Sequence, residues 1–264
     1  MITCRDITNA IEAAAPLSLA YPWDNCGLLT GNPQKEVKTV LTCLDADPNV
    51  VEEALAAGAD LILTHHPAIF HETKVFHDQT YAGRFLKVLL GSEICCYAAH
   101  TNLDCARGGL NDLLAEKIGF FNPSGVLESI SENDGLGRVY DLDPPISVGE
   151  LCGRVQSGLS IQKPLLFTGS PDRAVRRAAL CSGGGKSFAQ AAINAGADVY
   201  LTGDFDYDRA RECRNEGMSL ICIEHYDSEI IVCELFERIL RRSFGDALTI
   251  LTSQANGPVF HTYQ

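Results

Sequence analysis

The stretch EALAAGADLILTHH, residues 53–66, contains the two patterns on which the rest of the chain is built. Its first part completes a helix expected over 48–58, which begins near a proline and ends at Gly58. Proline at the start and glycine at the end are typical of helix boundaries. The second part, DLILT at 60–64, is a continuous apolar run of strand length. The stretch therefore predicts a helix, a glycine turn and a buried strand in succession.

Segments of these two kinds alternate along the chain. The expected strands cover 37–46, 60–64, 93–99, 175–182, 198–202 and 219–225. The expected helices cover 48–58, 80–91, 108–119, 186–196, 207–217 and 228–245. Apolar strands separated by helix-length segments predict an α/β fold with mostly parallel sheets that are covered on both faces. The segment 126–150 is rich in glycine, proline and acids, and it is expected to be a connection or a peripheral hairpin.

The opening stretch has a counterpart in the second half of the chain. Residues 53–66 align without a gap on AAINAGADVYLTGD, residues 191–204. One interpretation is that helix–glycine–strand units look alike in any α/β protein. The other is a duplicated α/β lobe. In that case His65 and His66 correspond to Gly203 and Asp204, at strand ends that face a common cleft.

Charge and composition exclude several classes of partner. The chain has 264 residues, with 21 Lys and Arg against 34 Asp and Glu, a formal charge of −13. This balance argues against nucleic acid or an anionic membrane as the primary partner, because no basic surplus can displace counterions from phosphates. A small-molecule substrate, even an anionic one, is compatible if metal ions or local cations receive it.

The cellular compartment is expected to be the cytoplasm. The N-terminal region has neither a basic leader nor an uninterrupted apolar segment, and no apolar run approaches the roughly 20 residues of a membrane span. The 11 cysteines are scattered, odd in number and mostly embedded in apolar stretches. They are typical of buried thiols in a reducing compartment.

Histidines and carboxylates gather at the expected strand ends, which is where ligands bind in open α/β sheets. His65 and His66 follow one strand, Asp104 follows another, and His225 ends a third. Glu229 lies four residues after His225, which places both on one helical face within reach of the same ion. The alternative is that these are ordinary surface or satisfied core residues.

The tandem histidines favour two metal ions over one. Pro67 biases His66 towards an extended backbone, and neighbouring side chains on an extended chain diverge. Each imidazole is then placed to serve its own ion, and Asp104 and Glu229 are available as bridging carboxylates. Such a set leaves positions open for water, as in catalytic dinuclear centres. Nitrogen and oxygen ligands suit Zn, Mn, Fe, Co or Ni without singling one out.

Other residues are candidates for substrate binding. The glycine run in CSGGGKSF, 181–188, does not form a P-loop, because Leu180 occupies the position of the first glycine. Gly184 and Lys186 could form an anion-binding nest, or the run could be a tight turn. Arg107 is a second candidate for steering an anion, although surface arginine is the common case. Asp204 either orients a ligand or bound water, or caps the helix expected over 207–217.

The only tryptophan, Trp23, stands beside two polar residues in YPWDNCGLLTG. It either holds a substrate base or anchors a loop or subunit contact, and the structural role is the favoured interpretation. The roles of Asp24 and Asn25 stay open.

Four spaced motifs resemble those of the GTP cyclohydrolase 1 type 2 family, also called the NIF-three-like family. They are YPWDNCGLLTG (21–31), LTHHPAIFH (63–71), HTNLDCARGGLNDLLAEKIG (100–119) and IEHYDSE (223–229). The resemblance runs in order from about residue 3 to the C-terminus, in the short form without an inserted domain. The sequence departs from the family in GDFDYD, 203–208, where members often have histidine.

The resemblance implies a single unit over 1–264, made of two similar, intertwined α/β/α lobes of about 1–125 and 126–264. It implies a dinuclear metal site in the cleft between the lobes, and commonly a ring-shaped hexamer. The implied ligands of two divalent ions are His65, His66, Asp104, His225 and Glu229.

Two functions are compatible with these expectations. The first is a dinuclear metal-dependent hydrolase that attacks a nucleotide-like or phosphorylated small molecule with metal-activated water. His100 is a candidate acid or base in this reaction. The second is a metal-binding or regulatory protein without turnover, assembled as a ring-shaped oligomer.

Overall fold

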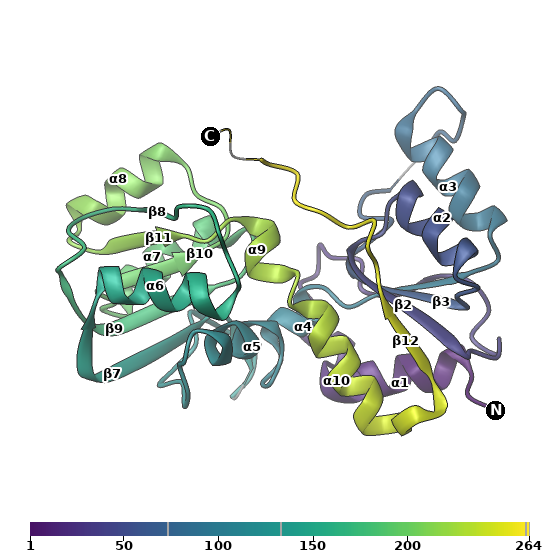
Figure 1. Cartoon of the computed structure of the whole chain (residues 1–264), viewed down its shortest axis with the longest axis horizontal. Helices are drawn as coiled ribbons and strands as arrows, with labels where there is room; N and C mark the ends of the chain where they lie inside the picture. The colour runs from purple at the N-terminus through teal and green to yellow at the C-terminus, as the bar shows by residue number, and fades with distance from the viewer. Residues whose placement is uncertain (73, 133, 262, 264) are drawn as a thin grey trace. The chain divides into compact units, whose positions relative to one another are not determined.

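The computed structural model describes residues 1–72, 74–132, 134–261 and 263, and the chain forms two compact units. The first unit is Met1–Leu103 with Val232–Gly257, and the second is Asp104–Ile231 with Pro258–Gln264. Each unit is therefore built from two separate stretches of chain. Figure 1 traces the path of the chain through both. None of the helices in the described part of the chain has both the length and the apolar character to cross a bilayer.

The first unit contains a five-stranded sheet in the order β1-β4-β3-β2-β12. The strands are β1 (Gly27–Thr30), β2 (Thr39–Asp45), β3 (Leu61–His66), β4 (Cys95–Ala98) and β12 (Thr249–Thr252). β12, β2, β3 and β4 are parallel, and only β1 is antiparallel to its neighbour. The carboxyl ends of the central strands therefore lie at one edge of this sheet.

Helices cover both faces of the first sheet. They are α1 (Cys4–Ala14), α2 (Pro48–Ala56), α3 (Tyr81–Gly91) and α10 (Val232–Phe244), with short 3-10 turns at Leu17–Leu19 and Gly245–Ala247. α2 and α3 pack on one face around a core that includes Val51, Ile62 and Phe85. α1 and α10 pack together, and α10 lies against β2 (Figure 1). The first unit is thus a three-layer α/β/α structure.

The second unit has its own five-stranded sheet, in the order β7-β9-β10-β11-β8. The strands are β7 (Arg138–Ser147), β8 (Leu166–Phe167), β9 (Ala174–Cys181), β10 (Val199–Thr202) and β11 (Ser219–Cys222). The three central strands are parallel, and the edge strands β7 and β8 are antiparallel. A small hairpin is formed by β5 (Glu128–Ser129) and β6 (Gly135–Leu136).

The segment 126–150 is more than a connection or a peripheral hairpin. It includes β7, which pairs with β9 along an edge of the second sheet. Two prolines and two acidic residues within 138–147 mask the strand pattern in the sequence. Arg138–Asp141 and the residues Ile146 and Ser147 pair with β9. The register shifts between these two runs, where the proline pair lies. An edge strand tolerates proline because one side of its backbone needs no strand partner.

The helices of the second unit are α5 (Leu110–Lys117), α6 (Val148–Gly158), α7 (Ala189–Asn194), α8 (Tyr207–Asn215) and α9 (His225–Glu229), with a 3-10 turn at Gly185–Phe188. α5 and α6 share one core with β9 and β10, through residues such as Leu114, Val155 and Leu180. Residues 104–125 therefore belong with the second unit, whereas the sequence placed the division near residue 125. The last helix and strand of the first unit, α10 and β12, come from residues 232–257.

The similarity between residues 53–66 and 191–204 extends to the hydrogen bonds. Gly58 and Gly196 both take positive φ, +64° and +72°. Asp60 Oδ2 accepts from the N–H groups of residues 38 and 39, at 2.8 and 3.1 Å. Asp198 Oδ2 accepts from those of residues 176 and 177, at 2.8 and 3.0 Å. Each aspartate thus ties its strand to the start of the preceding one, which supports the interpretation of a duplicated lobe.

Candidate metal centre

His65, near the end of β3, is fully buried in the first unit. Its Nδ1 lies 2.7 Å from the carbonyl oxygen of Ala99, just beyond β4. A carbonyl oxygen can only accept, so Nδ1 carries the proton and Nε2 has the lone pair. This is the tautomer in which an imidazole binds a metal through Nε2.

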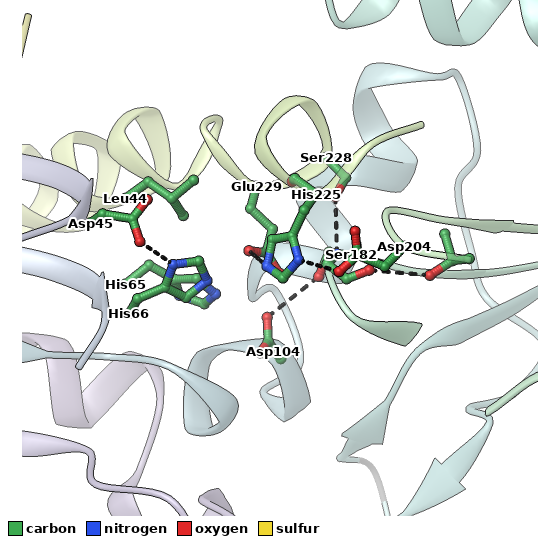
Figure 2. A network of polar contacts seen from close by, with 12 residues as sticks. Leu44, Asp45, His65, His66, Asp104, Ser182, Asp204, His225, Ser228 and Glu229 are labelled. Carbon is green, nitrogen blue, oxygen red and sulfur yellow. Dashed lines mark hydrogen bonds and ion pairs between the residues drawn. The ribbon is translucent and has the colours of Figure 1, made fainter. Parts of the chain in front are cut away.

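His66 is held in the same way from the other neighbouring strand. Its Nδ1 lies 2.7 Å from Oδ1 of Asp45, the last residue of β2 (Figure 2). The backbone of Asp45 is itself fixed by Asn256. The Oδ1 of that side chain accepts from the Asp45 N–H at 3.0 Å, and its Nδ2 donates to the Asp45 carbonyl at 2.9 Å.

His100 follows β4 and completes a group of three imidazoles in the first unit. The ring centroids of His65, His66 and His100 lie 5.2, 5.1 and 5.4 Å apart in the three pairs. One ring nitrogen from each lies within 4.8 Å of the others. Hydrogen bonds to the Ala99 carbonyl, just after β4, and to Asp45, at the end of β2, hold the Nδ1 atoms of His65 and His66.

Asp24 is the hydrogen-bond partner of His100. The Oδ1 atom lies 2.9 Å from His100 Nδ1, and the carboxylate also accepts from the N–H and hydroxyl of Thr101 and from the Cys26 thiol. Burial alone would raise the pKa of Asp24, but the hydrogen bonds from His100, Thr101 and Cys26 hold that pKa well below its ordinary value. Asp24 is therefore a charged acceptor inside the protein. Its role was left open by the sequence.

The second unit places His225 and Glu229 on one short helix, α9. His225 Nε2 lies 2.9 Å from Glu229 Oε2, which confirms the prediction that both lie on one helical face. His225 Nδ1 lies 2.7 Å from Asp204 Oδ2, beyond the end of β10 (Figure 2). Asp204 therefore orients His225, and the cap of α8 is Asp206 instead, which accepts from the N–H of Arg209.

Asp104 is a buried carboxylate of the second unit. One of its oxygens lies within 4.8 Å of a Glu229 oxygen, and Oδ1 lies 3.4 Å from the Ser182 hydroxyl (Figure 2). The side chain of Asn111 joins the two segments, because it donates to the Asp104 carbonyl at 3.0 Å and accepts from the Ser182 N–H at 2.9 Å. Neither Ser182 nor Asn111 was singled out in the sequence, where nothing local distinguishes them.

The glycine run after β9 lets the backbone approach the Glu229 carboxylate. Gly183 has a φ of +55°, and a Cβ there would overlap the Glu229 carboxylate. Its N–H donates to the Ser228 hydroxyl at 2.9 Å, and the Gly185 N–H donates to the Gly183 carbonyl at 2.9 Å. These two donors are used within the chain and are not directed at a bound anion. The tight-turn interpretation thus accounts for them.

The remaining candidate substrate residues lie on the surface. Lys186 is exposed and its Nζ lies 3.5 Å from Asp206 Oδ2, while Gly184 has open space around its Cα. Arg107 is also exposed, and its backbone N–H donates to Asp134 at 3.0 Å.

The donor set fits divalent transition-metal ions. His65, His66 and His225 each have Nδ1 against an oxygen, and this orientation is what a metal-binding imidazole requires. The carboxylates of Asp104 and Glu229 add hard oxygen ligands, and nitrogen with oxygen suits the metals named from the sequence.

The model of the family described as Duf34/NIF3 (NGG1p interacting factor 3) matches residues 2–258. The chain belongs to this family. A Clostridium perfringens protein named GTP cyclohydrolase 1 type 2 homolog is 34% identical over 96% of this chain and 97% of its own length. A Methanocaldococcus jannaschii protein of the same name is 32% identical over 89% and 93%. The resemblance read from the four motifs is therefore confirmed.

Solved structures agree with this membership of the Duf34/NIF3 family. A hypothetical protein of Staphylococcus aureus superposes with a TM-score of 0.88 at 26% identity and covers 99% of both chains. Reduced HcgD from Methanocaldococcus jannaschii superposes with a TM-score of 0.82 at 31% identity, over 95% of this chain and 97% of that chain. The NIF-three-like fold expected from the motifs is thus confirmed.

Proposed function

We propose that this protein is a dinuclear metal-dependent hydrolase, with His65, His66, Asp104, His225 and Glu229 as the ligands of two divalent ions. The observation that carries the proposal is the hydrogen bonding of the histidines. Each of the three has Nδ1 within 2.7 Å of an oxygen acceptor. Histidines that serve only packing have no need for this shared tautomer.

The order of the chain supports a joint role for ligands from both units. Asp104 is the first residue of the second unit and follows His100 by four positions. Glu229 precedes Val232, the residue at which the chain returns to the first unit, by three positions. Both carboxylates therefore stand beside a crossing of the chain, and we propose that they serve the same ions as the histidines.

The chemistry follows from this ligand set. Bound divalent ions supply a water of lowered pKa and polarise the centre that is attacked. The oxygen partners Asp45, Asp204 and the Ala99 carbonyl keep the three imidazoles oriented. Gly183 gives Glu229 the room to stay close to His225.

An exposed aromatic surface beside His100 supports a nucleotide-like substrate. Trp23 is 59% exposed and Phe70 is 39% exposed. Their ring centroids lie 6.1 Å apart, and each lies within 6.4 Å of the His100 ring. The Trp23 ring stacks on Tyr21, with centroids 5.5 Å apart, and its exposed part is available to stack on a planar base. Lys186, Gly184 and Arg107 remain proposals for the phosphate of a phosphorylated substrate.

The test is hydrolysis of a panel of nucleotides and small phosphoesters by protein loaded in turn with Zn, Mn, Fe, Co and Ni. We expect the Glu229→Gln variant to lose turnover while it keeps its fold by circular dichroism. Glu237→Gln is the matched control, because Glu237 is exposed on α10 and accepts a hydrogen bond from Arg241 Nε at 3.5 Å, one turn along the same helix. Trp23→Ala is expected to raise KM for the nucleotides alone.

Two outcomes would contradict the proposal. Equal activity of the Glu229→Gln and Glu237→Gln variants would remove Glu229 from the reaction. A metal-loaded wild type that turns over nothing in the panel would instead favour the metal-handling protein without catalysis. The ring-shaped homohexamer is a separate proposal, and light scattering coupled to gel filtration measures it directly.

A further inference from the structure

We propose that Lys163 is a positioning residue, which holds the short helix α9 so that His225 and Glu229 stay in place to bind metal. This inference rests on the function proposed above. It assigns a role to a residue that belongs neither to the four motifs nor to the proposed ligands. Lys163 lies in the second unit, in the segment between α6 and β8, far from α9 in the chain.

The ammonium group of Lys163 binds two carboxylates of the α9 region. It forms ion pairs with Glu224, the residue immediately before α9, and with Asp227, whose Oδ2 lies 2.7 Å from Lys163 Nζ. Glu224 and Asp227 are three positions apart, so their side chains lie on one helical face, next to the face of His225 and Glu229. The cation thus holds the chain on both sides of His225.

These ion pairs are sheltered from water. The side chains of Lys163, Glu224 and Asp227 are 21%, 23% and 19% exposed. Ion pairs between fully exposed side chains contribute little, because water and dissolved salt screen them. Here most of each side chain is covered, and loss of the lysine would leave two partly buried carboxylates without this cation. Its removal is therefore expected to displace the carboxylates, and α9 with them.

The backbone of Glu224 shows why α9 needs such support. Glu224 has a φ of +81° and a ψ of 143°, a conformation that residues with a Cβ rarely adopt and that persists only where the surroundings hold it. Its N–H donates to the Gly203 carbonyl at 3.1 Å, and its carbonyl accepts from the Ser228 N–H at 3.0 Å. α9 itself has five residues, too few for a helix to be stable without tertiary contacts. Because His225 directly follows Glu224, these backbone angles set the direction of the imidazole.

Lys163 is itself fixed at its backbone. Its carbonyl oxygen accepts from Nε2 of Gln156, on α6, at 3.0 Å, and Pro164 biases its backbone towards an extended conformation. A lysine on a free loop would follow the carboxylates wherever α9 moved. An anchored lysine holds them in place, which is what a positioning residue must do.

The experiment is a Co²⁺ titration of the full chain, followed by visible absorption. Lys163→Met removes the charge and keeps an apolar side chain. We expect it to weaken Co²⁺ binding about 10-fold, the lower end of the loss when outer partners of metal ligands are removed. Lys163→Arg keeps the charge and is expected to retain most of the affinity. A lysine that only stabilised the fold would not change the affinity of variants that circular dichroism shows to be folded.

Two further variants make the titration interpretable. Arg209→Met is the matched control, because it also removes one positive charge and one ion pair, to Glu212 at 2.6 Å, on the exposed surface of α8 in the same unit. It is expected to bind Co²⁺ as the wild type does. His225→Ala tests the metal site itself and is expected to bind Co²⁺ more weakly than any other variant.

The outcomes separate this inference from the proposed function. If Lys163→Met binds Co²⁺ as Arg209→Met does while His225→Ala binds it weakly, the inference is overturned and the proposed site stands. If His225→Ala binds as the wild type does, the proposed site fails and the inference fails with it. Should Lys163→Met not fold, Glu224→Gln replaces it, since it removes one of the two charges that the lysine binds. A loss of Co²⁺ affinity in that variant supports the inference, and wild-type affinity overturns it.

Discussion

The ends of β3 and β10 occupy equivalent places in the two units, yet they bear different residues. Both strands follow a helix and a glycine of positive φ, and both begin beside an aspartate that binds the preceding strand. β3 ends in His65 and His66, whereas the equivalent residues after β10 are Gly203 and Asp204. The two units share the arrangement of helix, glycine turn and strand, but the side chains at the end of the strand differ.

The second position of each pair shows how the chemistry changed. His66 is an imidazole oriented by the carboxylate of Asp45, and Asp204 is a carboxylate that orients the imidazole of His225. Both contacts join Nδ1 to a carboxylate oxygen at 2.7 Å. The two units therefore have the same histidine–aspartate pair with the roles at the equivalent position exchanged. After a duplication, a histidine–aspartate pair can be retained while the histidine, the candidate ligand, is supplied by a different segment of the chain.

The first position of each pair differs in the space around it. His65 has room for a buried imidazole, whereas a Cβ at Gly203 would lie 2.6 Å from the Gly183 carbonyl and 2.8 Å from the Ser228 hydroxyl. The second unit uses this space for the glycine turn beside Glu229. The comparison thus predicts that position 203 is intolerant of any side chain.

The largest effect is expected from Gly203→Ala. The added methyl group meets backbone atoms that cannot move aside freely, and overpacking of this kind costs about 1–3 kcal/mol in the free energy of unfolding. Gly184→Ala is the control, because a Cβ there meets nothing within 4 Å. It is expected to change that free energy by less than about 0.5 kcal/mol. Urea denaturation measures both, and equal stability of the two variants would show that the close approach at Gly203 is unimportant.

A smaller effect is expected from substitutions that test the exchange of roles between the two histidine–aspartate pairs. Asp45→Asn and Asp204→Asn each weaken the support of one ligand imidazole, so each is expected to lower zinc affinity by about 10–100-fold. Asp246→Asn serves as the control because the Asp246 side chain is fully exposed. Competition with a chromophoric chelator gives the affinities. A loss confined to one of the two variants would mean that the pairs are not equivalent.

Much of the fold could be predicted from local pattern. The helix expected over 48–58 is α2, which begins at Pro48 behind the capping Asp47. The strand expected over 60–64 is β3 and extends to His66. The edge strands β7 and β12 were not predicted, because prolines interrupt the first and the second depends on pairing with β2, some 200 residues away in the chain. Pairing at such distances leaves no local signal.

The candidate ligands were accessible to sequence reasoning, and among their hydrogen-bond partners only Asp204 was suggested in advance, as one of two alternatives. His225 and Glu229 are related by helix spacing, which the sequence displays. Asp45 and Asp204 each lie 21 positions from the histidine they orient, and Asp24 lies 76 positions from His100. Only the folded strands bring these groups together, so the sequence did not show which histidine Asp204 orients, and it did not indicate Asp45 or Asp24 as partners.

The most direct test of the account is the metal content of the purified wild-type chain after dialysis, measured by elemental analysis. If the oriented imidazoles and the two carboxylates are metal ligands, the protein retains two transition-metal ions per chain, and His65→Ala and His225→Ala each retain fewer. A wild-type protein that takes up no transition metal, even when it is supplied in excess, would contradict the central claim.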